Sequence, residues 1–375
     1  MSTKLPIVSL LLLVALAATA ATANPPLAPI VVDSYYGDYR VETKEAGLPA
    51  KSLDGPRRET WEAPPPADRR WRIGVLFPHL KDPYWRAVNA GIVAEARRQR
   101  IGMRLLSADG YDDLDQQRAA FNTLLEDGID GIILASISYT ALDERVEQAA
   151  AQGVPVVAVI NDIYSPAIRA KALVPFHEMG YQAGQFVTAD VPAGEKALVA
   201  FFPGPKGSGW APESLKGFFR AQREQPGKTR LLPPRWGDTG YAEQRRLIEA
   251  FLDRHDDIDY LVGNAVAAEV AIDVIKERGL DRRIKIVATY LIPSLYDKVQ
   301  AGLIAAAPSD MTVAQGRMAV DMMVRILDGE QPGEAFPFRA GPIIQTVTPE
   351  NIGRFSYESL FGDRDFAPVF ELPSP

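Results

Sequence analysis

The feature that most constrains this chain is a regular alternation of short apolar runs with amphipathic segments, which begins at residue 71. The run 72–77 (RIGVLF) predicts a buried strand, and 84–100 carries Val88, Ile92 and Ala96 at helical spacing, which predicts a helix. The series continues with predicted strands at 103–107, 131–135 and 154–160 and predicted helices at 114–125 and 140–152. Strands that alternate with helices in this way are typical of βαβ units and a parallel sheet.

A second series of the same kind follows the first. It comprises predicted strands at 170–174, 196–202, 229–233, 260–263 and 284–289 and predicted helices at 179–190, 211–225, 241–254, 267–278 and 293–300. A late strand at 303–307, a helix at 313–327 and an extended stretch at 342–347 indicate that the chain crosses back between two lobes near its end. We therefore predict an α/β fold of two doubly wound parallel-sheet lobes joined by a multi-strand hinge.

The predicted elements divide the chain into five parts. We assign residues 1–23 to a signal peptide, 24–70 to an N-terminal extension and linker, 71–163 with 311–335 to the N-terminal lobe, 164–310 with 336–350 to the C-terminal lobe, and 351–375 to a C-terminal tail.

The amino terminus predicts secretion. An apolar run at 5–18 follows Lys4, and the small residues Ala21, Thr22 and Ala23 have the spacing that a signal peptidase accepts. The alternative is an uncleaved anchor helix, but the run is shorter than the roughly 20 residues that a bilayer needs. We expect cleavage before Asn24 and a mature chain that lies in the periplasm without inserting into the membrane.

The extension at 24–70 is rich in proline and contains Tyr35, Tyr36 and Tyr39. Aromatic side chains are costly to leave in water, so we expect part of it to pack on the body of the protein rather than form a mobile leader. It is a candidate contact surface for a partner, and a cover for the first lobe is an equally good interpretation.

Composition excludes several kinds of function. The formal charge is −7, from 41 lysine and arginine against 48 aspartate and glutamate, which argues against a nucleic-acid partner. The chain has no cysteine and only three histidines, none at HExxH spacing, so we expect no metal site and no cofactor. No GxSxG motif is present, and neither His79 nor His177 has a nucleophile beside it in the sequence. We therefore expect no catalytic residues and no enzyme activity.

Ligands of open parallel sheets bind outside the carboxyl ends of the strands, so the residues that follow each strand are candidates. After the first strand, Asp82 and Pro83 predict a helix N-cap and first turn, and Tyr84 and Trp85 follow at once. The alternative is a capped helix with ordinary aromatic packing, although two adjacent rings point in different directions. The other candidates at strand ends are Tyr139, Asp162, Tyr164, Phe176, Trp210, Tyr290 and Asp310.

Two of these regions have a second interpretation. The stretch 161–164 (NDIY) is also the predicted first crossing between lobes, where the demands of a hinge explain it equally well. The glycine-rich loop 204–209 opens a helix, as phosphate-binding loops do, but it matches neither GxxxxGK[ST] nor GxGxxG, which favours a tight turn. The candidates at the strand ends would meet in the cleft between the two predicted lobes. Aromatic side chains with one or two carboxylates are what a methylated ammonium ion requires, so we interpret this cleft as a cation cage.

The sequence resembles the type I periplasmic binding proteins over about residues 71–347. The motifs that carry the resemblance are DPYW at 82–85, GIDGIIL at 128–134, GVPVVAVIND at 153–162, VGNAVAAEVA at 262–271 and QAGLIAAAPSDMTVAQG at 300–316. Sugar-binding members typically carry an arginine three residues before a Gly-Phe pair. Here Ser214 stands at that spacing before Gly217 and Phe218, so the sugar clamp is missing.

Within that family the chain is most similar to periplasmic sensors that report trimethylamine N-oxide to a sensor histidine kinase and so induce the trimethylamine N-oxide respiratory system. This similarity rests on KDPYW at 81–85, VPFHEMGYQAG at 174–184, FPGPKGSGW at 202–210, ATYLIP at 288–293 and the long extension. It implies ligand contacts at Asp82, Tyr84, Trp85, Phe176 and Tyr290, and the periplasmic domain of such a kinase as partner. The alternative is a substrate-binding protein of an ABC transporter for a sugar or another small solute.

Overall fold

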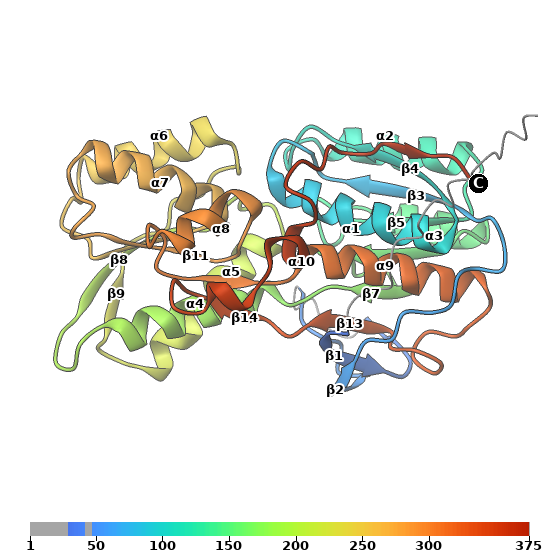
Figure 1. Ribbon diagram of the computed structural model, residues 1–375, viewed down its shortest axis with the longest axis horizontal. Helices are drawn as coiled ribbons and strands as arrows, with labels where there is room; N and C mark the ends of the chain where they lie inside the picture. Colours follow the sequence, from blue (N-terminus) through green and yellow to red (C-terminus); the bar gives the residue numbers. More distant parts are fainter. Residues whose placement is uncertain (1–28, 42–46, 375) are drawn as a thin grey trace, which may run out of the picture.

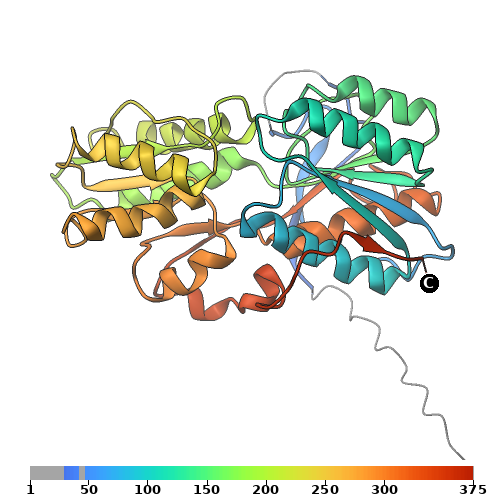
Figure 2. The same cartoon turned by 90° about the horizontal axis from the view of Figure 1, so that it is seen from above.

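The computed structural model describes residues 29–41 and 47–374. The predicted signal peptide lies outside the described residues. Two α/β lobes lie side by side, and α10 (Tyr357–Phe361) sits between them in both views (Figure 1, Figure 2). The predicted fold class is confirmed, because each lobe is built on a largely or wholly parallel sheet with helices on both faces.

The larger lobe contains a nine-stranded sheet in the order β15-β4-β3-β5-β6-β7-β13-β1-β2. The strands from β4 to β13 in this order run parallel, whereas β15, β1 and β2 pair antiparallel with their neighbours. Their bounds are β1 Val31–Tyr36, β2 Asp54–Thr60, β3 Arg72–Phe77, β4 Gly102–Ser107, β5 Gly131–Leu134, β6 Val156–Val159, β7 Ala170–Ala172, β13 Arg339–Pro342 and β15 Glu371–Leu372.

Helices cover both faces of this sheet, which explains why its central strands are apolar throughout. On one face, Val75 and Phe77 of β3 pack with α1 (Pro83–Gln99) and α9 (Thr312–Leu327). On the other face, Leu76 packs with α2 (Leu114–Glu126) and α3 (Asp143–Ala151).

The smaller lobe contains a four-stranded parallel sheet in the order β11-β10-β8-β9. Its helices α4 and α5 cover one face, and α6 and α7 cover the other. The bounds are α4 Phe176–Asp190, β8 Ala197–Phe202, α5 Trp210–Glu224, β9 Thr229–Leu231, α6 Tyr241–Leu252, β10 Tyr260–Gly263, α7 Ala265–Glu277, β11 Lys285–Ala288 and α8 Pro293–Gln300.

Helices α4 and α5 approach each other closely because glycines face the contact. A Cβ on Gly180 would lie 1.9 Å from the Ser214 carbonyl oxygen, and one on Gly217 would lie 1.8 Å from that of His177. Larger side chains at either position would push the helices apart and shift the start of both, where Phe176 and Trp210 lie.

The chain passes between the lobes at 173–175, 310–311 and 343–344, and a small antiparallel pair of β12 (Ala307–Ser309) and β14 (Gln345–Val347) lies next to the last two passages. These positions differ from the division expected from the sequence, which assigns 164–310 and 336–350 to the C-terminal lobe. The reason is pairing: Ala170 of β7 pairs with Val157 of β6, and Arg339 of β13 pairs with Lys171 of β7. Both strands therefore extend the larger sheet.

Both flanking segments of the body also join the larger lobe. The extension contributes β1 and β2, and its Trp61 indole nitrogen donates to Asp321 Oδ2 of α9 at 2.9 Å. The last segment runs through η1 (Ile352–Arg354) and α10 to β15, which pairs with β4. The expected linker at 63–70 has no regular secondary structure.

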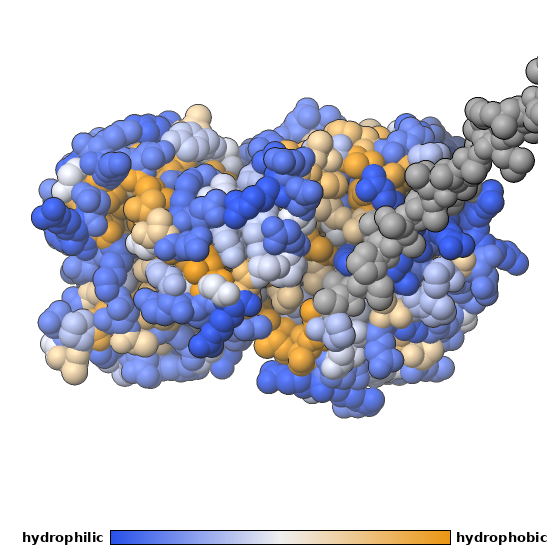
Figure 3. Space-filling model, in the orientation of Figure 1, coloured by the Kyte–Doolittle hydropathy of each residue, from blue (hydrophilic) through white to orange (hydrophobic). Residues whose placement is uncertain are grey.

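No helix in the described part of the chain combines the length and the apolar character needed to cross a membrane. The face of the molecule in Figure 3 is mostly hydrophilic, with apolar residues in separate patches.

Candidate functional site

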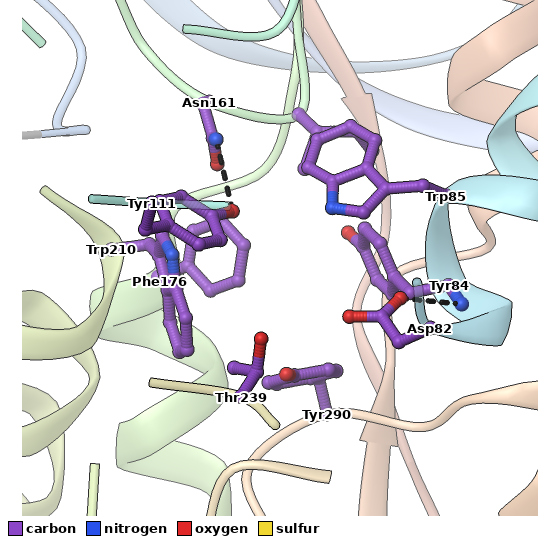
Figure 4. Close-up of a pocket in the computed structure, with 10 residues that line it drawn as sticks. Asp82, Tyr84, Trp85, Tyr111, Asn161, Phe176, Trp210, Thr239 and Tyr290 are labelled. Carbon is purple, nitrogen blue, oxygen red and sulfur yellow. Dashed lines mark hydrogen bonds between the residues drawn. The ribbon is translucent and has the colours of Figure 1, made fainter. Parts of the chain in front are cut away.

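A small cavity lies between the lobes, outside the carboxyl ends of the strands of both sheets, where such folds bind ligands (Figure 4). The larger lobe contributes residues from the start of α1 and from the ends of β4 and β6, and the smaller lobe contributes residues that follow the interlobe crossing and its own strands. The lining residues are Asp82, Tyr84, Trp85, Tyr111, Ile160, Asn161, Phe176, Trp210, Thr239 and Tyr290.

The first turn of α1 places three of these side chains. Asp82 is the N-cap with an extended backbone, and its Oδ1 accepts a hydrogen bond of 3.0 Å from the Tyr84 backbone N–H. Pro83 occupies the first helical position, as the sequence predicts. Tyr84 and Trp85 are both buried, and Trp85 retains only 2% of its accessible surface. Because the cap fixes the start of the helix, both rings face the cavity rather than the bulk solvent.

The aromatic rings form one continuous cluster across the two lobes. Tyr84 lies edge to face with Tyr290, with ring centroids 5.4 Å apart. Tyr290 in turn contacts Trp210 at 5.7 Å and Phe176 at 6.4 Å, and Tyr84 contacts its neighbour Trp85 at 5.4 Å. The cavity is therefore walled by aromatic edges and faces from both lobes.

Asp82 brings a negative charge to this aromatic wall. Burial raises the pKa of its carboxyl group to about 6, although the backbone N–H groups of Trp85 and Tyr84 oppose that shift. In Figure 4 one carboxylate oxygen meets the Tyr84 backbone and the other points into the cavity. The Asp82 side chain can therefore carry a negative charge beside the aromatic rings near neutral pH.

The nearest basic groups do not neutralise Asp82. His79 Nε2 lies 3.8 Å from Asp82 Oδ2, but burial lowers the pKa of this imidazole to about 3, so it is uncharged. Lys81 forms an ion pair with Asp238 of the smaller lobe instead. The carboxylate is left to attract a cation from the cavity.

The candidate residues differ in where the structure places them. Asp82, Tyr84, Trp85, Phe176, Tyr290 and Trp210 line the cavity, whereas Tyr139, Asp162, Tyr164 and Asp310 do not. Asp310 lies directly behind the wall, where its Oδ2 accepts a hydrogen bond of 2.5 Å from the Tyr84 hydroxyl. Burial raises the pKa of Asp310 to about 6. It holds the Tyr84 ring in place.

The other residues of that group belong to a buried cluster of charges and rings in the larger lobe. Asp162 Oδ1 accepts 2.7 Å from Lys171 Nζ, and its Oδ2 lies 3.7 Å from Arg339 Nη1. The Tyr139 and Tyr164 rings pack at 6.0 Å beside it. Because two cations compensate Asp162, it does not provide free negative charge to a ligand. This arrangement fits the hinge interpretation of 161–164 better than a ligand contact.

The glycine-rich loop 204–209 is a tight turn that positions an aromatic ring. Ser208 Oγ donates to the Pro205 carbonyl oxygen at 2.8 Å. Gly204 has φ +120°, and a Cβ there would lie 2.6 Å from the Trp210 ring. The glycine lets the backbone pass directly against the indole that lines the cavity.

Three lining residues were not among the sequence candidates: Tyr111, Ile160 and Thr239. Tyr111 lies in the loop after β4, so the rule of residues at strand ends would have found it. Ile160 adopts φ +64°, which is unusual for a β-branched residue and is not readable from sequence. Thr239 lies just before α6, after a loop whose path only the folded structure defines. Among the described residues, no group of three or more His, Asp or Glu could hold a metal ion.

Two α/β lobes with an aromatic-lined cavity between them define the class of this protein. A family model described as "Periplasmic binding protein domain" matches residues 73–331, which is more than half of the chain. The chain belongs to this family, and the resemblance inferred from the sequence is confirmed.

Individual members of the family are similar to this chain over most of its length. The chain is 32% identical to "Periplasmic protein TorT" of Escherichia coli (strain K12) over 304 residues, which cover 81% of this chain and 85% of that protein. It is 34% identical to the solved structure of an ABC transporter solute binding protein from Bradyrhizobium sp. BTAi1 with bound Bis-Tris, covering 92% and 99% of the two chains at a TM-score of 0.77. Structures of the TorS sensor domain–TorT complex, without ligand and with TMAO, are 29% identical at TM-scores of 0.70 and 0.72 and cover 80% of this chain and 99% of that chain.

Proposed function

We propose that this protein binds trimethylamine N-oxide, or a similar small methylated amine, in the cavity between its lobes and reports it to the periplasmic domain of a TorS-like sensor histidine kinase. Through that kinase it would induce the trimethylamine N-oxide respiratory system. The observation that carries the proposal is the uncompensated carboxylate of Asp82 within a wall of aromatic rings.

The chemistry of the ligand matches this wall. In trimethylamine N-oxide the nitrogen carries a formal positive charge, which spreads over three methyl groups. Aromatic faces attract such a cation through their ring quadrupoles, and the attraction is stronger in a desolvated site. The rings of Trp85, Tyr84, Phe176 and Tyr290 supply the faces, and Asp82 supplies negative potential.

The relatives point to the same ligand class. TorT has been solved in complex with the TorS sensor domain in the presence of TMAO. The Bradyrhizobium relative contains Bis-Tris, which is itself a tertiary amine. Both facts concern those proteins, and they support an amine ligand here.

Signalling follows from closure of the two lobes. A ligand that contacts Trp85 on one lobe and Tyr290 on the other binds the closed form better, so it changes the outer surface without touching it. We propose the periplasm as the site of this action, reached by cleavage of the predicted signal peptide. The proposal involves no bond making and no catalytic residue.

Isothermal titration calorimetry of residues 24–375 tests the ligand. We expect binding of trimethylamine N-oxide and no binding of ribose or galactose, because the sugar clamp is missing at Ser214. Tight binding of a sugar together with no response to trimethylamine N-oxide would refute the proposal.

A second function is a substrate-binding protein of an ABC transporter, and the Bradyrhizobium relative favours it. Co-purification separates the two. A sensor holds the periplasmic domain of a TorS-like kinase in a ligand-dependent manner. Absence of any complex, together with solute uptake that depends on this protein, would favour the transporter.

A further inference from the structure

The hydroxyl group of Thr239 is buried at the cavity without a hydrogen-bond partner among the described residues. The residue retains 3% of its accessible surface, and its Oγ1 makes no hydrogen bond. In Figure 4 this oxygen points toward the middle of the cavity, between the Trp210 and Tyr290 rings. A buried hydroxyl without a partner is unfavourable, so its presence requires an explanation.

Local structure does not supply that explanation. Thr239 precedes α6, whose N-cap is Gly240 and has no side-chain cap, so the hydroxyl does not cap the helix. Its neighbour Asp238 is held by Lys81 on one side and by Gln244, whose Nε2 donates 2.6 Å to the Asp238 carbonyl. These contacts fix the loop and leave the threonine hydroxyl directed at the ligand space.

Two other fully buried polar atoms on the wall also make no hydrogen bond to the described residues, and they are less suited to an anionic oxygen. Asn161 Oδ1 is a carbonyl oxygen and can only accept, and the two donors of its amide nitrogen are directed at Ser136 O at 2.8 Å and at the Tyr111 hydroxyl at 3.3 Å. Trp210 Nε1 belongs to a ring that packs against Tyr111, with centroids 5.9 Å apart. Thr239 is a small donor of the smaller lobe that faces the cavity directly, opposite the indole nitrogen of Trp85 on the larger lobe.

We propose that Thr239 donates a hydrogen bond to an acceptor oxygen of the ligand and thereby selects methylated amines that carry such an oxygen over methylated amines that do not. This inference rests on the proposed function and deepens it. Asp82 of the larger lobe and Thr239 of the smaller lobe would orient the ligand in the cavity. The cationic methyl groups would face Asp82, and the oxygen would face Thr239. A ligand with both ends would bridge the lobes.

A pair of matched ligands isolates this hydrogen bond. Tetramethylammonium has the tetrahedral shape of trimethylamine N-oxide, with a methyl group where the oxide has its oxygen. Calorimetric titration of both ligands into wild type, Thr239→Val and Thr239→Ser measures the contribution of one hydroxyl. Thr239→Val keeps the shape of the side chain and removes only the donor.

We expect Thr239→Val to weaken trimethylamine N-oxide binding about tenfold to a hundredfold, the range for a hydrogen bond to a charged group. Tetramethylammonium binding should stay within about twofold, and Thr239→Ser should retain wild-type preference. Thr289 provides a control, because it is also buried with an unpartnered hydroxyl but does not line the cavity. Thr289→Val should change neither affinity.

The outcomes separate this inference from the function on which it rests. Equal losses for both ligands in Thr239→Val, or no loss for either, would overturn the role of Thr239 while leaving the cation cage intact. If the wild type binds neither ligand, the proposed function fails and this inference fails with it.

Discussion

At the scale of single residues, Trp85 presents the largest ring that the larger lobe contributes to the cavity, and it packs tilted against Phe77 at 5.0 Å. If methyl groups of the ligand face this indole, Trp85→Ala should weaken binding by about 2 kcal/mol, or thirtyfold. Trp85→Phe should lose less, because it keeps a ring. Calorimetry with trimethylamine N-oxide measures the effect, and a thermal melt checks that the variant is folded. Unchanged affinity in Trp85→Ala would show that the methyl groups of the ligand do not contact this ring.

Asp82 should make ligand binding depend on pH. Its pKa of about 6 lies above that of a free carboxyl group, so the negative charge that attracts the cation is present at pH 7 and is lost as pH falls through 6. Affinity should therefore drop by up to about tenfold per pH unit below that point. Asp82→Asn should lack much of this drop and bind about tenfold more weakly at pH 7. Since ligand protonation is common to both proteins, the difference between the two pH profiles belongs to the carboxylate.

The same substitution separates charge from helix capping. The sign of the stability effect is opposite to that of binding: a carboxyl group with a raised pKa stabilises the fold most when protonated, and this contribution is lost as pH rises through 6. Asparagine is also a good N-cap and carries no buried charge, so Asp82→Asn should keep or raise the melting temperature at pH 7, whereas Asp82→Ala should be about 1 kcal/mol less stable than Asp82→Asn. A melting temperature of Asp82→Asn well below wild type would show that the charge serves the fold rather than the ligand.

Sequence alone predicts the site well where covalent order determines it. Asp82, Tyr84 and Trp85 follow a strand and occupy a capped first turn, so their positions depend only on local geometry. Thr239 could not be predicted, because contacts made only in the folded molecule, such as the Lys81–Asp238 ion pair, decide where its loop runs. For Asp162 the sequence leaves a ligand contact and a hinge role open, because a carboxylate at a strand end looks the same in sequence whether or not two cations compensate it.

At the scale of elements, the extension is anchored to the larger lobe by Trp61. Its indole donates to Asp321, whose carboxylate also lies in a buried network with Arg98 and Glu95 between α1 and α9. Removing the donor to this buried carboxyl group should destabilise the fold, so we expect Trp61→Phe to lower the free energy of unfolding by about 1–3 kcal/mol. Urea denaturation measures this.

Trp61 does not line the cavity, so ligand affinity in the folded variant should equal that of wild type. Unaltered stability in Trp61→Phe would mean that the extension merely lies on the lobe.

The alternation of apolar runs with amphipathic segments predicts helices and strands, because each segment must bury one face or both. It does not predict to which sheet a short strand belongs. β7 and β13 are brief buried runs that either sheet could accept. The preceding elements determine which sheet each strand joins. β7 follows β6 closely and pairs with it, and β13 follows α9 of the same lobe and pairs with β7. The lobe boundaries at 164 and 336 therefore needed long-range contacts that no local pattern contains.

At the scale of the whole molecule, an ion pair joins the lobes at the cavity. Lys81 precedes Asp82, Asp238 precedes Thr239, and the two charges meet across the cleft with 34% and 24% of the two side chains exposed. A Cβ on Gly110 would lie 3.3 Å from Lys81 Nζ and 3.8 Å from Asp238 Oδ2, so the loop that carries Tyr111 lies against the same pair. This contact favours the closed form.

Reversing one charge should open the cleft. We expect Lys81→Glu to speed ligand dissociation about two- to fivefold, because a partly exposed ion pair contributes up to about 1 kcal/mol. The double variant Lys81→Glu/Asp238→Lys should restore most of the wild-type rate. Stopped-flow tryptophan fluorescence measures dissociation.

Lys285→Glu is a matched control, because Lys285 pairs with Asp190 within the smaller lobe. A double variant no slower than the single one would contradict a role for the interlobe pair.

The order of strands in the larger sheet affects how the protein can assemble. The sheet ends on one side at β15, the last described strand, and on the other at β1 and β2, the first two, so both ends of the described chain flank a sheet whose middle comes from the residues between them. Pairings between such distant segments form slowly, since loop closure costs entropy before any contact repays it. The lobe therefore completes only when the whole polypeptide is present. Removal of β15 would leave β4 as an unpaired edge strand, and removal of β1 and β2 would leave β13 as one. Unpaired edge strands are surfaces on which proteins aggregate.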